Sequence, residues 1–228
     1  MISGVVLAAG LSRRMGANKL LLKLAGRPVV ALAIDAFLKS RLDEVVVVAS
    51  EPVGRSLAAR RPGLRVIINR EPEAGMSASL KLGLRAAEGR AVVIGMGDQP
   101  LLLPSTIDAV IAEYARSDAK VVVPVHRGQR GNPVLFDRVL FPQIEEISGD
   151  VGAKSVVSQN QDQVLEVEVG DAGILLDVDS PSDIAVAERM LEERAMQRRS
   201  LGGGARPRSS LHPGKSSSRA VRRRRSIS

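Results

Sequence analysis

The sequence contains no cysteine and no tryptophan, and only one tyrosine and three phenylalanines among its 228 residues. Without cysteine, disulfide bonds, thiolate catalysis and cysteine-ligated metals are excluded. The shortage of aromatic rings leaves little on which nucleic-acid bases could stack, as they do on single-strand binding proteins. With only His126 and His212, a metal site built from several histidines is not expected either.

Long apolar runs are also missing. No run approaches the roughly 20 residues that a membrane-spanning helix needs. The apolar start, Ile2–Ala9, is too short for a secretory signal peptide and leads into glycine and arginine. We therefore expect a cytoplasmic protein without a membrane partner.

The positive charge is confined to one end of the chain. The formal net charge is +8, but residues 194–228 hold ten arginines, one lysine and no acid. The other 193 residues hold 22 basic and 25 acidic side chains, a net charge of −3. We predict a folded domain over 1–197, not itself expected to bind nucleic acid, and a disordered Arg/Ser-rich tail over 198–228. The Arg222–Arg225 cluster leaves open whether the tail binds nucleic-acid phosphates or is a solvated extension.

The domain alternates apolar runs with segments of helical periodicity. Five runs are mainly apolar and β-branched, and their apolar residues are continuous instead of alternating, which is typical of strands buried on both faces: Gly4–Ala8, Glu44–Ala49, Leu64–Ile68, Ala91–Gly95 and Lys120–Pro124. Between them lie four predicted helices: Pro28–Lys39, Val53–Arg61, Ser77–Glu88 and Pro104–Arg116. This alternation predicts an α/β fold with three layers and a mostly parallel sheet.

The alternation ends after Pro124. Pro133–Phe136 is predicted to be extended and Asp150–Gln159 helical, and Val164–Val169 and Ile174–Val178 are predicted strands. A last helix should begin at Pro181, with Ser180 as its N-cap, and end at about Gln197.

The segment Leu7–Lys19, which reads LAAGLSRRMGANK, follows the first predicted strand. Glycines let backbone N–H groups approach an anion closely, and Arg13, Arg14 and Lys19 can neutralise it. The segment fits neither the P-loop pattern nor the dinucleotide fingerprint. It therefore predicts a phosphate-binding loop of another kind.

Acidic residues follow two other predicted strands. A carboxylate such as Asp98, at the carboxyl end of a central strand, faces the same crevice as the first loop and could hold Mg²⁺. The alternative is a turn aspartate near the Pro104 helix. Asp177 and Asp179 stand on either side of Val178 at the end of a predicted strand, and we expect only one of them to face the metal. Asp179 could instead support the N-terminus of the next helix.

Two further segments could complete a site. Gly75, Ser77 and Ser79 stand at a predicted helix start, where free N–H groups could hold a base edge or a phosphate, or could simply form a cap. The polar turn Arg130–Pro133 could form a wall of an acceptor pocket.

These segments together resemble the MobA-like nucleotidyltransferases, most closely their molybdenum cofactor cytidylyltransferase branch. The resemblance covers about residues 1–195. It is carried by Leu7–Gly10, Ser12, Arg14–Gly16, Lys19, Gly97–Pro100, Gly131–Pro133, Gly149–Ala153 and Asp177–Pro181. One departure is Gln99, where the family often has methionine.

The resemblance implies a Rossmann-like, nucleotide-diphospho-sugar-transferase type of fold that uses Mg²⁺ and moves a nucleoside monophosphate from a triphosphate to a phosphorylated acceptor. Its implied catalytic residues are Arg14, Lys19 and Asp98, and its implied metal ligands are Asp98, Asp177 and Asp179. The implied nucleotide-binding residues are Leu7, Ala8, Ala9, Gly10, Ser12, Arg14, Gly16, Lys19, Gly75, Ser77 and Ser79. The implied acceptor-binding residues are Gln99, Pro100, Asn132 and Pro133.

The pair Ala8-Ala9 resembles the cytidylyl branch, since guanylyl-transferring relatives carry Leu-Ala-Gly-Gly. The resemblance thus implies CTP and a molybdopterin-type acceptor as partners, and it allows a molybdenum hydroxylase apoenzyme as a protein partner. The chain offers no Ser-His-Asp or Cys-His set, which is consistent with an acceptor phosphate acting as the nucleophile. Another phosphorylated acceptor, or an oxidoreductase of the nicotine-pigment type, remains an alternative.

Overall fold

The computed structural model describes residues 1–10, 18–57 and 62–202. The chain divides into two compact units, Met1–Glu192 and Glu193–Ser228, and the fold below is that of the first. The predicted domain boundary after residue 197 falls inside the last helix, α7 (Pro181–Gly202), and stays a prediction. Ser12, Arg14 and Gly16 lie outside the described residues.

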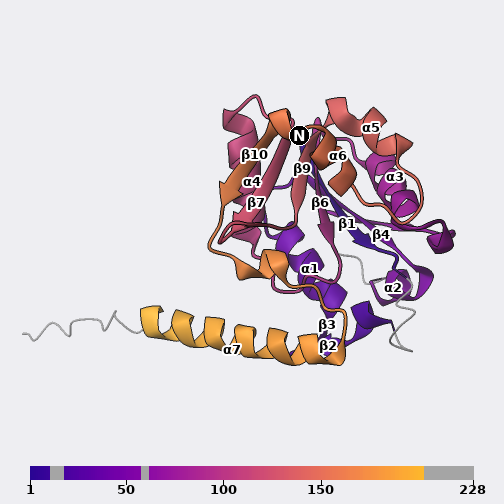
Figure 1. Ribbon diagram of the computed structural model, residues 1–228. Coiled ribbons are helices and arrows are strands. Elements are labelled where there is room, and N and C mark those ends of the chain that lie inside the picture. The colour runs from indigo at the N-terminus through magenta and orange to yellow at the C-terminus, as the bar shows by residue number, and fades with distance from the viewer. Residues whose placement is uncertain (11–17, 58–61, 203–228) are drawn as a thin grey trace, which may run out of the picture. The chain divides into compact units, whose positions relative to one another are not determined.

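A single large sheet forms the centre of the first unit (Figure 1). Its strands lie side by side in the order β10 (Val164–Glu168), β7 (Val121–His126), β9 (Val134–Asp137), β6 (Ala91–Met96), β1 (Ile2–Ala8), β4 (Glu44–Ala49) and β5 (Leu64–Ile68), with β8 (Gln129–Arg130) paired to β7. All pairs on this path are parallel except those of β9, which runs antiparallel to both β6 and β7. The predicted mostly parallel sheet is confirmed.

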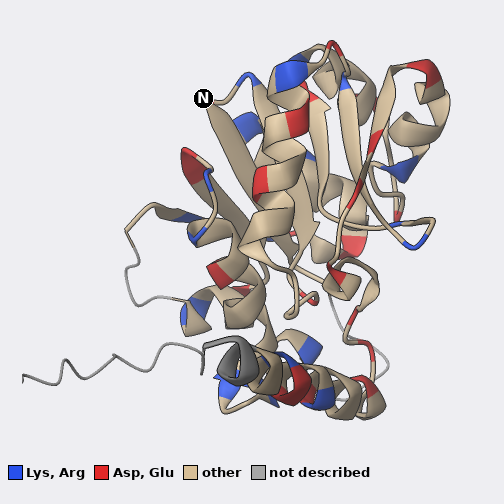
Figure 2. Ribbon diagram, turned by 90° about the vertical axis from the view of Figure 1, so that its left-hand side faces the viewer, with Lys and Arg blue, Asp and Glu red and all other residues tan. Residues whose placement is uncertain are grey.

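Helices cover both faces of this sheet because alternate residues of each buried strand point to opposite sides. On one face, Val5 and Leu7 pack with α3 (Met76–Ala86), α5 (Phe141–Glu146) and α6 (Lys154–Gln159). On the other, Val6 and Ala8 pack with α1 (Val29–Leu38), α2 (Glu51–Ser56) and α4 (Pro104–Arg116). In Figure 2 the strands are mostly uncharged, and the charged residues lie mainly on helices and loops. The predicted three layers are confirmed.

Several short elements complete the described part of the chain. The hairpin of β2 and β3 turns at Ala25 and Gly26, which both have positive φ, as two-residue hairpin turns require. The predicted helix over Asp150–Gln159 begins only at Lys154, and part of the predicted Val53–Arg61 helix lies outside the described residues. The short elements are β2 (Lys23–Leu24), β3 (Arg27–Pro28) and the 3-10 turns η1 (Lys19–Leu21), η2 (Pro72–Ala74), η3 (Arg138–Leu140), η4 (Gln161–Gln163) and η5 (Ala172–Leu175).

The predicted strand over Ile174–Val178 is wrong. The segment begins in η5 and then continues without pairing to the sheet. Val178 N–H donates a hydrogen bond to the carbonyl of Asp98, just beyond the end of β6 (2.9 Å). The segment therefore crosses the strand ends. There Ile174 belongs to the core cluster on the α1 and α4 side of the sheet, and Val178 belongs to a separate apolar cluster with Val29 of α1 and Ala187 of α7.

Asp171 explains why the chain turns at this point. Its carboxylate, 2% exposed, accepts hydrogen bonds from Gly173 N–H (3.0 Å), Leu103 N–H (2.8 Å) and the Thr106 hydroxyl (2.8 Å). Leu103 is the N-cap residue of α4 and has no capping side chain of its own. A carboxylate from far along the chain thus satisfies the start of α4 and opens η5.

Among the helices of the described ranges, none is both long and apolar enough to cross a membrane.

We predict that Asp171→Ala lowers the free energy of unfolding by about 2–4 kcal/mol, because it removes a cap and leaves buried donors without an acceptor. Chemical denaturation followed by circular dichroism measures this. Asp118→Ala, which removes an exposed carboxylate at the other end of α4, serves as the control and should change little. Equal losses in the two variants would contradict the capping role.

Tyr114 gives a second test, because its hydroxyl donates to Asp137 Oδ2 (2.7 Å) from a buried position on α4. Burial, and then the hydrogen bond and charge of Asp137, raise the pKa of Tyr114 to about 12, against the opposing charge of Arg90. Since the chain has one tyrosine and no tryptophan, ultraviolet absorbance in alkaline solution reports this group directly.

We expect a midpoint near pH 12 in the native protein and near pH 10 in denaturant. Stability from this group is complete below pH 10 and is lost between pH 10 and 12, because the unfolded chain loses the proton first. Asp137→Asn removes the neighbouring charge and should lower the native midpoint. A native midpoint near pH 10 would contradict the burial of the hydroxyl.

Candidate functional site

Two predicted segments meet at the carboxyl ends of β1 and β6. Leu7 stands opposite Met96 in the parallel register, and Gly97 N–H donates to the carbonyl of Leu7 (2.9 Å). A Cβ on Gly97 would lie 3.1 Å from both the carbonyl oxygen of Leu7 and the Cβ of Ala8, so the close passage favours glycine. The residues after β1 therefore lie beside Asp98, as the sequence predicts.

Lys19 joins two carboxylates at this edge. Its Nζ lies 2.6 Å from Asp98 Oδ2 and 2.6 Å from Asp179 Oδ1. The side chains of Lys19 and Asp98 are only 17% and 12% exposed, whereas that of Asp179 is 71% exposed. The structure thus brings together Lys19, Asp98 and Asp179, which we call the charged cluster.

The charged cluster favours the cationic form of its lysine. Burial alone lowers the pKa of Lys19, but the charge of Asp98 and the hydrogen bonds to Asp179 and Asp98 outweigh this, and the pKa is raised above its ordinary value. Lys19 is therefore an ammonium ion at neutral pH. Its charge offsets part of the negative charge of the two aspartates.

Asp177 lies next to the charged cluster but has a different partner. Its Oδ1 accepts a hydrogen bond from Gln99 Nε2 (2.8 Å). Burial, and then the negative charge of Asp98, raise the pKa of Asp177, while the Gln99 hydrogen bond opposes this shift. Because no strand forms here, strand geometry does not decide which of Asp177 and Asp179 faces the metal.

The donor set of the charged cluster fits a divalent cation. Oδ1 of Asp98 is buried and, within the described residues, has no hydrogen-bond partner. Mg²⁺ is typically held by one or two carboxylates together with substrate phosphates. In the part of the chain that the structure describes, no three His, Cys, Asp or Glu side chains converge to form a cage of protein ligands. The arrangement therefore fits a metal shared with a phosphorylated substrate.

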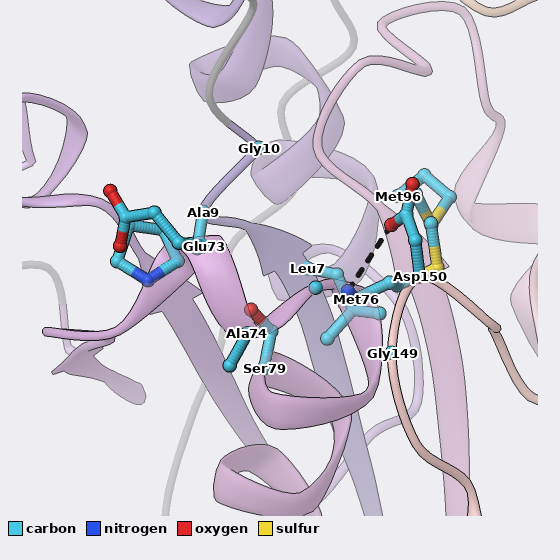
Figure 3. A pocket seen from close by; sticks show the side chains of 12 residues that line it. Leu7, Ala9, Gly10, Glu73, Ala74, Met76, Ser79, Met96, Gly149 and Asp150 are labelled. Atoms are coloured by element: carbon cyan, nitrogen blue, oxygen red, sulfur yellow. Dashed lines mark hydrogen bonds between the residues drawn. The ribbon is translucent and has the colours of Figure 1, made fainter.

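An open pocket of about 460 Å³ lies at the same strand ends (Figure 3). Leu7, Ala9 and Gly10 after β1 and Met96 at the end of β6 form one side of it. The other walls come from the η2–α3 region and from a loop before α6: Pro72, Glu73, Ala74, Gly75, Met76, Ser79, Gly149 and Asp150. Of the predicted nucleotide-binding residues, Leu7, Ala9, Gly10, Gly75 and Ser79 line it.

Hydrogen bonds join the loop before α6 to the start of α3. Met76 N–H donates to Asp150 Oδ1 (3.3 Å, dashed in Figure 3), and Ser77 N–H donates to the carbonyl of Gly149 (3.2 Å). Gly75 has φ +89°, and a Cβ there would lie 2.5 Å from the Gly149 carbonyl. The expectation that these N–H groups are free for a ligand is wrong, because protein acceptors already occupy them.

Two of the four predicted acceptor residues bind the same carbonyl group. Gln99 Nε2 (3.3 Å) and Asn132 N–H (3.2 Å) both donate to the carbonyl of Ile174. Gln99, Pro100 and Pro133 are buried, so they lie beneath the surface of the site. Their contact with an acceptor stays a prediction, as do the roles of Ala8 and Ser77, which are buried and do not line the pocket.

Sequence reasoning missed part of the pocket. Met96 could have been found, because a parallel register of β1 and β6 puts it opposite Leu7. Pro72, Glu73, Ala74 and Met76 carried no signal, since their position depends on how the chain enters α3.

The comparisons with known proteins agree on the family. Residues 4–164 match the MobA-like NTP transferase domain. The purine catabolism protein PucB of Bacillus subtilis is 34% identical over 204 residues, covering 82% of this chain and 96% of PucB. The molybdenum cofactor cytidylyltransferase of Escherichia coli is 24% identical, covering 84% of this chain and 98% of that protein. A probable molybdenum cofactor guanylyltransferase of Pyrococcus furiosus is 34% identical, but the match covers 54% of this chain and 61% of that protein.

Solved structures agree as well. The Mycobacterium tuberculosis protein Rv0371c has a TM-score of 0.73 and 29% identity, covering 84% of this chain and 97% of its own. The same protein has also been crystallised in complex with manganese. The fold is thus that of the nucleotidyltransferases, with a mixed, mostly parallel sheet. The chain belongs to the family of proteins with a MobA-like NTP transferase domain and is a nucleotidyltransferase of that family.

Proposed function

We propose that this protein transfers CMP from CTP to the phosphate of a molybdopterin-type cofactor, releases pyrophosphate and uses Mg²⁺. The observation that carries the proposal is the charged cluster, in which the Lys19 ammonium lies 2.6 Å from both Asp98 and Asp179. It stands at the strand ends that also border the pocket. A cation and two carboxylates beside a pocket are what a triphosphate and its metal ion require.

Lys19 and Gly10 would bind the triphosphate. Ser12, Arg14 and Gly16, which lie outside the described residues, would contribute to the same binding by their place in the motif. As the leaving pyrophosphate gains negative charge, the ammonium of Lys19 would stabilise that charge most strongly in the transition state. Its small exposure keeps it in a region of weak screening by water.

Asp98 would hold the metal, with Asp179 as the second carboxylate and Asp177 beside them. When bound, Mg²⁺ supplies positive charge to the phosphate oxygens. The buried Oδ1 of Asp98, without a hydrogen-bond partner in the described chain, supports this role, because such an oxygen is costly unless it meets a cation or donor. The manganese complex of Rv0371c supports a divalent cation in this fold.

The reaction itself needs no nucleophile from the protein. An oxygen of the acceptor phosphate attacks the α-phosphorus, the bond from that phosphorus to the bridging oxygen breaks, and pyrophosphate leaves with the electron pair. The acceptor oxygen is already anionic, so the residues of the site have to align the two substrates and balance their charge. Gln99, Pro100 and Pro133, which are buried, and the partly exposed Asn132 would shape the acceptor side of the site.

The choice of CTP rests on the first loop and on the extent of similarity. Leu7 and Ala9 line the pocket, and Ala8-Ala9 matches the cytidylyl branch. The E. coli cytidylyltransferase is matched over 98% of its length, whereas the P. furiosus guanylyltransferase is matched over 61%. The greater extent of the match therefore supports cytidylyl transfer.

The acceptor is proposed from the relatives that are named for the molybdenum cofactor. A molybdenum hydroxylase apoenzyme, receiving the product, is the matching proposed protein partner. Transfer to another phosphorylated acceptor would use the same charged cluster.

We expect Asp98→Asn to lower kcat by about a thousandfold or more, since it removes a charge that the metal requires while keeping the size of the side chain. Pyrophosphate release measures turnover, and electron paramagnetic resonance of Mn²⁺ measures metal binding, which should weaken in the same variant. Asp118→Asn, which changes an exposed carboxylate just after α4, is the matched control and should keep both properties. A wild-type rate in Asp98→Asn with Mg²⁺ would refute the metal assignment.

We expect pyrophosphate release to depend on both CTP and molybdopterin cofactor. In a panel of CTP, GTP, UTP and ATP, kcat/KM for CTP should exceed the others by about a hundredfold, the selectivity that one pocket typically provides. A preference for GTP would refute the base assignment, and release without the cofactor but with a phosphosugar would refute the acceptor.

A further inference from the structure

Asn69, directly after β5, is held in a defined orientation behind the pocket. It is only 3% exposed, and its Oδ1 accepts a hydrogen bond from the backbone N–H of Glu71 (2.9 Å). Because that N–H can only donate, the oxygen and nitrogen of the amide are assigned without ambiguity. The Nδ2 group then donates to Oγ of Ser79 (2.9 Å).

Ser79 is the residue through which Asn69 can act on a ligand. It is 6% exposed, stands in the first turns of α3 and lines the pocket, whereas Asn69 does not (Figure 3). In the part of the chain that the structure describes, the Ser79 hydroxyl accepts from Asn69 and donates to no protein atom. A hydroxyl has one hydrogen, so this hydrogen is available to the pocket.

We propose that Asn69 is a positioning residue for nucleotide recognition, which orients the Ser79 hydroxyl so that it donates to an acceptor atom on the base. O2 and N3 of cytosine are acceptors of this kind. The inference rests on the proposed function, because it takes the pocket to hold the base. It adds a residue that the motif of the first loop does not contain and that touches no substrate itself.

The substitution Asn69→Asp reverses the polarity with little change in shape. One carboxylate oxygen can still accept from Glu71 N–H, which preserves the turn after β5. The other oxygen replaces an amide donor, so the Ser79 hydroxyl now donates to it. Ser79 then presents lone pairs to the pocket, where they face the acceptor atom of the base.

The experiment measures CTP affinity by isothermal titration calorimetry without the acceptor, for wild type, Asn69→Asp, Ser79→Ala and the double variant. We expect each single substitution to weaken CTP binding about tenfold, the effect of one lost hydrogen bond. The double variant should bind no more weakly than Ser79→Ala, because without the hydroxyl the polarity at position 69 no longer matters. In the complete reaction, KM for CTP should rise by a similar factor in each single variant.

Asn160→Ala is the matched control for loss of a buried asparagine. Asn160 is 6% exposed, and its Nδ2 donates to the carbonyl of Val156 (2.8 Å) and to Gln143 Oε1 (2.8 Å), at the end of α6. This variant should lose stability in thermal unfolding without a change in CTP affinity. A purely structural role of Asn69 would make Asn69→Asp behave in the same way.

Three outcomes separate the claims. Affinity in Asn69→Asp equal to wild type, or losses that simply add in the double variant, would overturn the positioning role while leaving the proposed function intact. If the wild-type protein prefers another nucleoside triphosphate, the CTP assignment of the proposed function is refuted, whereas a tenfold loss of affinity for that nucleotide in Asn69→Asp still supports the positioning role and an unchanged affinity overturns it. A wild-type protein that binds none of the four triphosphates contradicts the proposed function and this inference together.

Discussion

The ion pairs that Lys19 forms with Asp98 and Asp179 are the interactions on which the charged cluster depends. Asp98 is almost completely covered, and a buried carboxylate without a compensating charge costs several kcal/mol. Lys19 supplies that charge from the turn after the first loop, and the same ammonium reaches Asp179, 160 positions further along the chain. One cation thus draws three segments to the carboxyl ends of β1 and β6. The site is therefore assembled by electrostatics, on a scaffold that is held together by apolar packing.

That scaffold was largely predictable from the sequence because its strands are buried on both faces. Runs such as Val5–Ala8 are apolar at every position, and the structure divides them between two cores, with Val5 and Leu7 on one side and Val6 and Ala8 on the other. The wrong strand at Ile174–Val178 is also rich in aliphatic residues, with four of them around Asp177. Composition cannot tell whether such a segment pairs with a neighbouring strand or crosses the strand ends, and here Asp171 turns the chain across the strand ends.

The candidate site was likewise predictable only in part. Lys19 and Asp98 could be expected to meet, since the ends of adjacent parallel strands share one edge. The pairing of Lys19 with Asp179, and of Gln99 with Asp177, could not, because it depends on the path of a segment without regular structure. At the start of α3 the sequence predicts N–H groups that could bind a ligand. In the structure, Asp150 and Gly149 of a distant loop accept hydrogen bonds from the first of these N–H groups.

Different groups of the site serve its two tasks, the binding of phosphate and metal charge and the recognition of the base. The cation and its two carboxylate partners lie around Lys19 and Asp98, whereas the pocket is lined mostly by apolar side chains, backbone and the hydroxyl of Ser79, with Glu73 and Asp150 as its acidic residues. Electrostatic attraction acts over several ångströms and is tolerant of direction, but a hydrogen bond to a neutral base is lost when its donor rotates. A hydroxyl that recognises the base from the pocket wall therefore needs a neighbour that fixes its orientation. The buried Asn69 fixes that of Ser79, because its amide oxygen and amide nitrogen are both hydrogen-bonded. Asp171 orders the start of α4 in a similar way. Selectivity for the base can in this way change by substitution in the η2–α3 region without disturbing the charges that the chemistry requires.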